Sequence, residues 1–324
     1  MRDVRIGVVG ATGAVGPVML QLLAERGYDR VRAFASARSA GTTVPFGESA
    51  LEVEEATVEA LSDGSLDLCF FAIGTDASRE LVPAAVEGGA VCIDKSSAFR
   101  LVDGVPLVVP EVNAARGFEH KGIVANPNCS TIQLVCVLKP LQDAAGLRGV
   151  RLATYQARSG AGAESMEELR AERPEQHSVT MDWEFDGEEF DEEAKLRAET
   201  RKILELENLP FTVTCVRVPV MVGHTQSVWV QTDDELSPDK AREALSAAES
   251  VRVVEPYPDP RDAVGGDEVL VGRIRRDPTT ENGLALFIAC DNLRKGAALN
   301  ALQIAEALHE RPLLVADNRR LRAV

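Results

Sequence analysis

Short apolar runs alternate with amphipathic segments along the first third of the chain. The apolar runs predict strands at residues 4–9, 30–36, 66–74, 89–94 and 105–112. A helical pattern follows the first run as far as about Arg26, and a second spans residues 76–89, where Pro83 predicts a kink or two short pieces. Strands and helices in alternation predict an α/β fold that begins with a Rossmann-type, doubly wound parallel sheet.

The pattern changes after residue 128. Helical periodicity occurs at residues 130–144, 164–173, 191–206 and 295–310, and in a further helix capped by Ser237. Strand-like runs occur at residues 211–220, 227–233, 251–255, 268–276 and 286–290. This order predicts an α+β arrangement with a largely antiparallel sheet. We therefore expect a first domain of residues 1–127, to which a C-terminal helix at 293–324 returns, and a second domain of residues 128–292.

Charge and cysteine content narrow the class of protein. The 324 residues carry a formal net charge of −16, which argues against a nucleic-acid partner because phosphates require a basic face. No uncharged run is long enough to span a membrane, and the N-terminus has no leader pattern. The six cysteines are scattered without metal-ligand spacing, so we expect no metal and a reduced, cytoplasmic protein. Any anionic ligand must then be held by a local cluster of basic residues.

A glycine-rich turn separates the first strand from its helix. It reads GATGAVG, and a pyrophosphate resting on it would contact the residues Gly10, Thr12, Gly13, Ala14 and Val15. Glycines let the backbone approach a pyrophosphate, whose charge rests on the N-terminus of the following helix. Such turns also serve simply to pack a helix on a sheet, but the position between strand and helix favours a nucleotide site.

The end of the second predicted strand indicates which dinucleotide binds. A site for NAD expects an acidic residue there to hold the ribose hydroxyls. This chain has Ser36, Arg38 and Ser39 instead, and no acid before Glu48. A guanidinium between hydroxyls suits a 2′-phosphate, so NADP is the expected cofactor; the alternative is an ordinary surface arginine.

Cys129 lies where a thiol can react. Pro127 turns the chain out of an apolar strand, and Asn128 is a good N-cap, so Cys129 would open the next helix. A helix N-terminus stabilises a thiolate. The other five cysteines lie within apolar runs, as small buried residues do.

A nucleophilic thiolate together with a nicotinamide cofactor implies oxidation of an aldehyde through a thioester. That reaction needs a general acid or base. Of the four histidines, His224 falls between two predicted strands, from which its side chain could reach the cysteine, whereas His120 and His177 lie in polar loops and His309 late in the closing helix.

Several motifs together resemble one known family. In chain order the motifs are GATGAVG, ASARSAG, SSAFR, VPLVVPEVN, NPNCST, TYQARSGAG, ETRKI, CVRVPV followed by His224, VGRIR and DNLRKGAALNALQIAEAL. They are similar to motifs of the aspartate-semialdehyde dehydrogenases, and the resemblance extends from about Arg5 to Glu310. NPNCST in combination with YQARSGAG is specific, whereas the glycine turn alone is not.

The resemblance implies roles for residues near the reacting atoms. Cys129 would be the nucleophile, His224 the acid/base, and Gln156 the residue that orients the substrate. Ser159 and Gly160 would lie beside the nicotinamide, and the residue that contacts the cofactor as the chain returns to the first domain would be Asn292.

The same resemblance implies a set of charged residues that hold the substrate. Arg217 would pair with the α-carboxylate and Glu199 with the α-ammonium, while Lys202 and Arg100 would hold the phosphate. Glu199 and Lys202 share one helix face, a spacing that also occurs in surface ion pairs. A guanidinium in an apolar strand, such as that of Arg217, needs a partner.

The family resemblance implies a reversible reaction. L-4-aspartyl phosphate would be reduced by NADPH to L-aspartate 4-semialdehyde and phosphate through a cysteine thioester, in the pathway to lysine, threonine, methionine and diaminopimelate. The first domain would then bind NADP, and the second would catalyse the reaction and form a homodimer or a dimer of dimers.

Two departures and several alternatives accompany this interpretation. The family usually has asparagine at Lys95, and an apolar, proline-bearing segment where this chain has an acidic stretch at 173–190. A close-analogue semialdehyde dehydrogenase is one alternative. N-acetyl-γ-glutamyl-phosphate reductase is another, but its cysteine lies in a G-C-Y motif and its substrate has no ammonium for Glu199. A non-catalytic nucleotide sensor would have lost Cys129 or His224, and a cysteine hydrolase would leave the glycine turn without a purpose.

Overall fold

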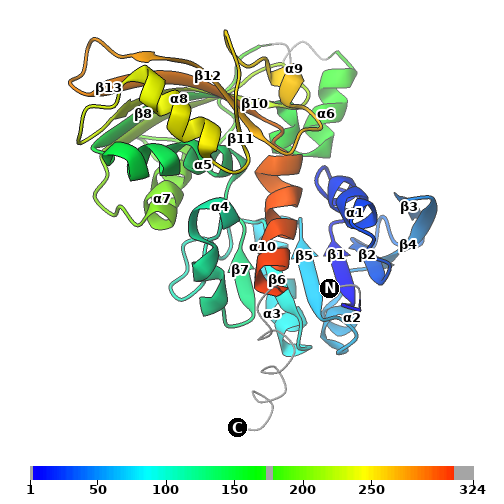
Figure 1. Ribbon diagram of the computed structural model, residues 1–324. Helices are drawn as coiled ribbons and strands as arrows, with labels where there is room; N and C mark the ends of the chain where they lie inside the picture. Colours follow the sequence, from blue (N-terminus) through cyan, green and yellow to red (C-terminus); the bar gives the residue numbers. More distant parts are fainter. Residues whose placement is uncertain (1–2, 173–177, 310–324) are drawn as a thin grey trace. The chain divides into compact units, whose positions relative to one another are not determined.

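The structure is a computed structural model that describes residues 3–172 and 178–309. It consists of two compact units, Met1–Pro127 with Ala297–Val324, and Asn128–Gly296 (Figure 1). The first two residues, residues 173–177 with His177, and residues 310–324 of the expected returning segment lie outside the described part. No helix in the described part is long and apolar enough to cross a membrane.

The first unit is built on a seven-stranded sheet with the order β3-β4-β2-β1-β5-β6-β7. Its strands are β1 (Ile6–Val9), β2 (Val31–Ala35), β3 (Thr43–Phe46), β4 (Ser49–Glu55), β5 (Leu68–Phe71), β6 (Val91–Asp94) and β7 (Ile123–Ala125). All neighbours are parallel except β3 and β4. The predicted Rossmann-type parallel sheet is confirmed.

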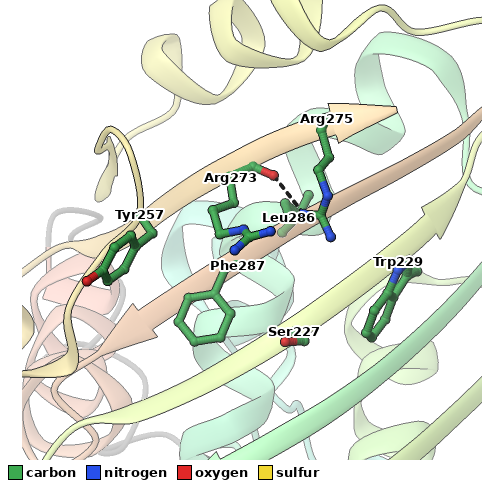
Figure 2. A pocket seen from close by; sticks show the side chains of 7 residues that line it. All are labelled: Ser227, Trp229, Tyr257, Arg273, Arg275, Leu286 and Phe287. Atoms are coloured by element: carbon green, nitrogen blue, oxygen red, sulfur yellow. Dashed lines mark hydrogen bonds between the residues drawn. The ribbon is translucent and has the colours of Figure 1, made fainter. Parts of the chain in front are cut away.

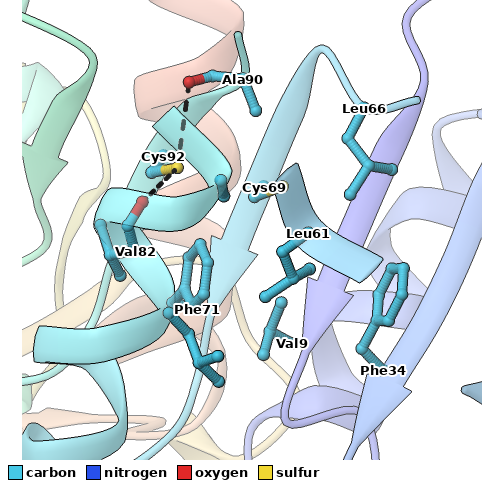
Figure 3. Close-up of a cluster of buried hydrophobic side chains, with 11 residues drawn as sticks. Val9, Phe34, Leu61, Leu66, Cys69, Phe71, Val82, Ala90 and Cys92 are labelled. Atoms are coloured by element: carbon cyan, nitrogen blue, oxygen red, sulfur yellow. Dashed lines mark hydrogen bonds between the residues drawn. The ribbon is translucent and has the colours of Figure 1, made fainter. Parts of the chain in front are cut away.

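Short helices follow the strands of the first unit. They are α1 (Gly16–Glu25), α2 (Val58–Ser62), α3 (Thr75–Glu87), α4 (Pro110–Asn113), the 3₁₀ helix η1 (Ala114–Glu119) and α10 (Leu299–His309). Apolar side chains of β1, β2 and β5 meet those of α2 and α3 in one buried cluster, in which Val9, Phe34, Leu61, Phe71 and Val82 are drawn in Figure 3. This packing holds the carboxyl end of β1, and with it the glycine turn, in a fixed place.

Two local predictions for the first unit are wrong. Pro83 lies inside a single uninterrupted helix, α3, since the buried face of α3 compensates for the one lost backbone donor. The predicted strand at 105–112 forms only one bridge, from Leu107 to Ala125, because Pro110 starts the helical turn α4. The side chain of Asn113 accepts a hydrogen bond from the Val109 N–H at 2.9 Å and so stabilises this turn.

The second unit contains a six-stranded sheet with the order β11-β12-β13-β10-β8-β9. Its strands are β8 (Gly149–Gln156), β9 (Phe211–Arg217), β10 (His224–Gln231), β11 (Val251–Val253), β12 (Val269–Arg276) and β13 (Gly283–Cys290). The three pairings among β8, β10, β13 and β12 are antiparallel, and the two outer pairings are parallel. The predicted, largely antiparallel sheet is confirmed.

Three helices, α5 (Cys129–Ala145), α7 (Asp191–Leu204) and α8 (Pro238–Ala247), pack against strands of this sheet. The remaining short elements are η2 (Arg158–Ala161), α6 (Ala163–Arg170), α9 (Pro260–Ala263) and a π-helical turn at Arg294–Ala298. Alternate residues of β8 and β10 are buried beneath the helices, as the period of two requires. The central helix α5 is buried along most of its length, which fixes its first residue relative to the sheet.

A shallow groove lies on the sheet of the second unit. Figure 2 shows the side chains that line it, namely Ser227, Trp229, Tyr257, Arg273, Arg275, Leu286 and Phe287. Tyr155 packs near the ring of Phe287, with ring centroids 6.5 Å apart. Aromatic and arginine side chains of this kind are common in protein–protein interfaces.

Candidate active site

Three strands of the second unit place candidate site residues at the same end of its sheet. Gln156 and Arg217 end the parallel strands β8 and β9, where they are paired in register. His224 begins the antiparallel strand β10 opposite Cys290, the last residue of β13. The prediction that His224 falls between strands is therefore wrong by a small margin. Because these ends coincide, Gln156, Arg217 and His224 lie close together.

Cys129 is the first residue of α5, as predicted. The Asn128 side chain caps the helix by accepting a hydrogen bond from the Ser130 N–H at 2.8 Å. The Gln226 side chain, two residues along β10 from His224, donates to the Ser130 carbonyl at 2.8 Å. Side chains two residues apart on a strand share a face, so His224 lies on the α5 side of the sheet. The N-terminus of α5 is thus held against the strand that carries the histidine.

The environment of Cys129 differs from that of the other cysteines. None of the six forms a disulfide, and Cys129 alone is partly exposed, whereas the other five are buried. Burial raises the pKa of the thiols of Cys92, Cys215 and Cys290 and keeps them protonated. A Cβ on Gly296 would lie 3.2 Å from the Cβ of Cys129, so the glycine leaves room beside this cysteine.

His224 is fully buried and has a defined tautomer. Its Nδ1 accepts a hydrogen bond from the Ala157 N–H at 3.0 Å, so the neutral ring carries its proton on Nε2. Within the described residues Nε2 has no hydrogen-bond partner. Burial, and then the charge of Arg217, hold the pKa of His224 well below its ordinary value. At neutral pH this histidine therefore offers one N–H donor to a ligand.

Arg217 is buried and held by a segment that the sequence marked as unusual. Both carboxylate oxygens of Asp182 lie 3.2 Å from its Nε, and the ring of Trp183 lies 4.6 Å from its guanidinium carbon. Thr180 pairs with the backbone of Arg217 on the outer edge of β9. Sequence reasoning missed Asp182 and Trp183; its one signal was the departure of residues 173–190 from the family pattern.

Gly160 packs against the side chains of Arg217 and His224. A Cβ at this position would lie 2.8 Å from Nη1 of Arg217 and 3.0 Å from Nε2 of His224. Any larger residue would displace them, so the space in front of the histidine depends on this glycine.

The helix α7 supplies carboxylates to the start of α5. Glu199 is buried and its Oε2 accepts the Asn128 N–H at 2.7 Å. Lys202 lies on the same helix, three residues further along, and is partly exposed. Sequence reasoning missed Glu192, whose Oε1 accepts hydrogen bonds from Nδ2 of Asn128 at 2.9 Å and from Nε2 of Gln156 at 3.0 Å.

Ser159 and Asn292 also meet in the second unit. Nδ2 of Asn292 donates to the Ser159 hydroxyl at 2.8 Å, and Oδ1 of Asn292 accepts the Gly223 N–H at 2.9 Å. Both side chains are buried. They connect the end of β13 to the loops that follow β8 and precede β10.

In the first unit the glycine turn follows β1 directly. Gly10 has a φ of 92°, and a Cβ there would lie 2.4 Å from the Ala72 carbonyl oxygen. A Cβ on Gly16 would lie 2.2 Å from the Gly10 carbonyl oxygen. The Gly13 N–H donates to the same carbonyl at 3.0 Å and closes the turn before α1. Only glycine fits positions 10 and 16, and the start of α1, which follows the turn directly, suits a pyrophosphate.

The residues expected to hold a 2′-phosphate flank this turn. The Thr12 hydroxyl donates to that of Ser39 at 3.3 Å, and the Ser39 N–H donates to the Ser36 carbonyl at 2.8 Å. Arg38 is exposed and, within the described residues, takes part in no ion pair. An exposed guanidinium between two hydroxyls fits an anionic ligand.

Arg100 also belongs to the first unit. It is buried, and its guanidinium donates to the carbonyls of Asn126, at 3.1 Å, and Lys95. Lys95 follows β6, where its own N–H donates to the Phe71 carbonyl at 3.0 Å. Among the described residues there is no group of three or more side chains that could hold a metal ion.

Family models match most of the chain. Residues 5–119 match the model "Semialdehyde dehydrogenase, NAD binding domain". Residues 138–184 and 179–295 match "Semialdehyde dehydrogenase, dimerisation domain".

Individual relatives extend over nearly the whole length. The aspartate-semialdehyde dehydrogenase of Aquifex aeolicus is 43% identical, with 96% of this chain and 99% of the relative covered. That of Bacillus subtilis is 41% identical, with 95% and 98% covered. The crystal structure of aspartate semialdehyde dehydrogenase II from Vibrio cholerae, complexed with ASA, has a TM-score of 0.90 at 36% identity and covers 96% of this chain and 99% of its own.

A more distant relative was solved with NADP bound. The aspartate semialdehyde dehydrogenase of Candida albicans, solved with NADP, has a TM-score of 0.74 at 26% identity, with 94% of this chain and 98% of its own covered. Sequence motifs, fold and near-complete coverage agree, and the chain belongs to the aspartate-semialdehyde dehydrogenases, a family of oxidoreductases.

Proposed function

We propose that this chain catalyses the NADPH-dependent, reversible reductive dephosphorylation of L-4-aspartyl phosphate to L-aspartate 4-semialdehyde and phosphate. One observation carries the proposal: a partly exposed cysteine opens the capped helix α5, which is tied to the strand that bears a buried, neutral histidine. This arrangement provides a thiolate nucleophile and, close by, a hydrogen-bond donor.

The Cys129 thiolate attacks the acyl carbon of the substrate. The sulfur–carbon bond forms, the bond from carbon to the phosphate oxygen breaks, and phosphate leaves with its electron pair. When bound, NADPH supplies the hydride that reduces the resulting thioester. The hemithioacetal oxyanion then collapses to the aldehyde: its carbon–sulfur bond breaks, and the sulfur leaves with the electron pair as the thiolate. The neutral ring of His224 stabilises the departing sulfur by donating a hydrogen bond from Nε2, and keeps its proton.

Charged residues orient the substrate. The guanidinium of Arg217 holds the α-carboxylate, and the carboxylate of Glu199 attracts the α-ammonium. Lys202 and Arg100 stabilise the phosphate, and the Gln156 amide orients the chain between these ends. The buried or partly buried positions of these side chains support these roles, because charged groups act more strongly outside bulk water.

The first unit binds the cofactor in this proposal. The close approaches at Gly10 and Gly16 leave a cradle that a Cβ would fill, and the start of α1 offers N–H groups to the pyrophosphate. Thr12, Gly13, Ala14 and Val15 complete this turn. Ser36, Arg38 and Ser39 hold the 2′-phosphate, and Ser159, Gly160 and Asn292 of the second unit contact the nicotinamide end.

The proposal is tested with L-aspartate semialdehyde and the reduction of NADP, measured with and without phosphate and repeated with NAD. We expect phosphate-dependent reduction of NADP and weak reduction of NAD. Cys129→Ala should abolish turnover and retain NADP binding. Unchanged turnover in this variant would exclude Cys129 as the nucleophile.

The open groove supports a homodimer as the assembly. The match to a dimerisation domain includes its lining residues, and aromatic side chains such as Trp229 suit the centre of an interface. Trp229→Glu should convert a dimer measured by light scattering into a monomer; a dimer that survives would place the interface elsewhere. The absence of disulfides among the six cysteines, all of which lie in the described part of the chain, supports a reducing, cytoplasmic location.

A further inference from the structure

Glu192 occupies a buried position between two residues of the proposed site. It is the second residue of α7, and the residue is 6% exposed. A single oxygen, Oε1, accepts hydrogen bonds from the side-chain amides of Asn128, at 2.9 Å, and Gln156, at 3.0 Å. One carboxylate thus connects the residue that caps the cysteine helix to the residue expected to orient the substrate.

This connection fixes which way each amide faces. Oε1 of Glu192 accepts both hydrogen bonds, so both amides turn their nitrogen toward Glu192. For Asn128 this leaves Oδ1 for the Ser130 N–H, which it accepts at 2.8 Å. For Gln156 it leaves Oε1 on the side of the amide away from Glu192, where it can accept a hydrogen bond from a ligand. A neutral amide without this neighbour could rotate and present its nitrogen instead.

We propose that Glu192 is a positioning residue, which acts on the reaction by holding the Gln156 amide and the Asn128 cap in their working orientations. The proposal rests on the proposed function. It predicts that loss of the Oε1 acceptor lowers kcat more than it raises KM, because the substrate still binds but is poorly oriented in the transition state.

The neighbouring Glu193 provides a matched control. It is also buried and belongs to the same turn, but its Oε1 accepts the Cys215 N–H at 2.9 Å and its Oε2 accepts the Phe190 N–H at 3.0 Å. Both contacts are to backbone groups, so Glu193 stabilises the start of α7 against β9. Its two oxygens are both used, whereas Glu192 uses one oxygen for both amides.

Three single variants separate the two roles. Glu192→Gln keeps one oxygen that can accept both hydrogen bonds, and should lower kcat less than about 10-fold. Glu192→Met keeps the volume but removes the acceptor, and should lower kcat on the order of 100-fold, as expected for a misplaced catalytic group. Glu193→Gln should lower the thermal midpoint and leave kcat unchanged, since one backbone N–H loses its acceptor.

A double-mutant cycle with Gln156→Ala tests whether Glu192 acts through Gln156. If it does, Glu192→Met together with Gln156→Ala should be scarcely slower than Gln156→Ala alone. Multiplying effects, or equal kcat values in Glu192→Met and wild type, would overturn the positioning role. Failure of the wild-type protein to reduce NADP would instead contradict the proposed function, so the two failures are distinguishable.

Discussion

At the scale of single residues, the cap at Asn128 distinguishes Cys129 from the other five cysteines. Its Oδ1 holds the Ser130 N–H, and its own N–H and amide are held by Glu199 and Glu192. The cysteine therefore lies on a helix end that is fixed from three sides. At this position the dipole of α5 favours the thiolate form of Cys129.

Asn128→Ala should weaken both the helix and the nucleophile. Loss of the cap should lower the free energy of unfolding by about 1 kcal/mol. It should also slow alkylation of Cys129 by iodoacetamide at neutral pH, because the frayed helix end stabilises the thiolate less. The rate of alkylation as a function of pH, followed by mass spectrometry of the labelled peptide, measures the loss of thiolate. An alkylation rate equal to that of the wild type would show that the cap does not influence the thiolate.

A second residue-scale prediction concerns the counter-ion of Arg217. Asp182→Asn leaves a buried guanidinium without its carboxylate and should lower the free energy of unfolding by about 1 kcal/mol, a modest value because Asp182 itself is exposed. Glu184→Gln removes the same charge two residues away at an exposed position and serves as the control. Equal denaturation midpoints for the two variants would contradict the stabilising role of Asp182.

At the scale of elements, the glycine turn between β1 and α1 requires glycine at particular positions. Gly10→Ala should reduce NADP affinity on the order of 100-fold or more, because the Cβ meets the Ala72 carbonyl and moves the turn. Gly74→Ala is the control, since a Cβ there meets nothing within 4 Å. Titration calorimetry with NADP compares the two. An unchanged affinity in Gly10→Ala would remove this turn from the cofactor site.

Most elements could be predicted because their burial has a regular period. The strands β3 and β4 were not predicted from the sequence. They lie toward one edge of the sheet and are largely exposed, so their sequences do not alternate between apolar and polar residues. The run at 105–112 is apolar because it is buried in the first unit, and this property does not distinguish a strand from an irregular segment. Tertiary packing, which local patterns do not contain, also kept α3 intact at Pro83.

The site was predictable to the extent that its residues lie in local motifs. Cys129 and its cap are adjacent in sequence, and so are the glycines of the turn. Glu192 and Asp182 act across 64 and 35 residues of chain, on Asn128 and Arg217 respectively. Contacts at such separations depend on the fold, so no local pattern could reveal them.

At the scale of the whole molecule, two neutral histidines, the buried His224 and the partly buried His120, make the free energy of unfolding depend on pH. Burial lowers the pKa of His224 strongly, and burial also lowers that of His120. The unfolded chain therefore binds protons below about pH 6.5 that the folded chain does not, and stability present above this pH is lost as the pH falls. Each such histidine contributes up to about 1.4 kcal/mol per pH unit in this window.

His224→Asn should remove the largest part of this dependence. Urea denaturation of wild type and variant at pH 7 and at lower pH values measures the slope, and His120→Asn provides the comparison. We expect the slope below about pH 6.5 to flatten more in His224→Asn than in His120→Asn. Equal slopes in wild type and His224→Asn would mean that the buried ring does not have the lowered pKa.

The covalent role of Cys129 is tested most directly by mixing the protein with L-aspartate semialdehyde and NADP in the absence of phosphate. We predict a rapid burst of reduced NADP equal to the number of active sites, and then almost no turnover until phosphate is added to cleave the thioester. Cys129→Ala should show no burst. Steady reduction at the same rate with and without phosphate would contradict the thioester route.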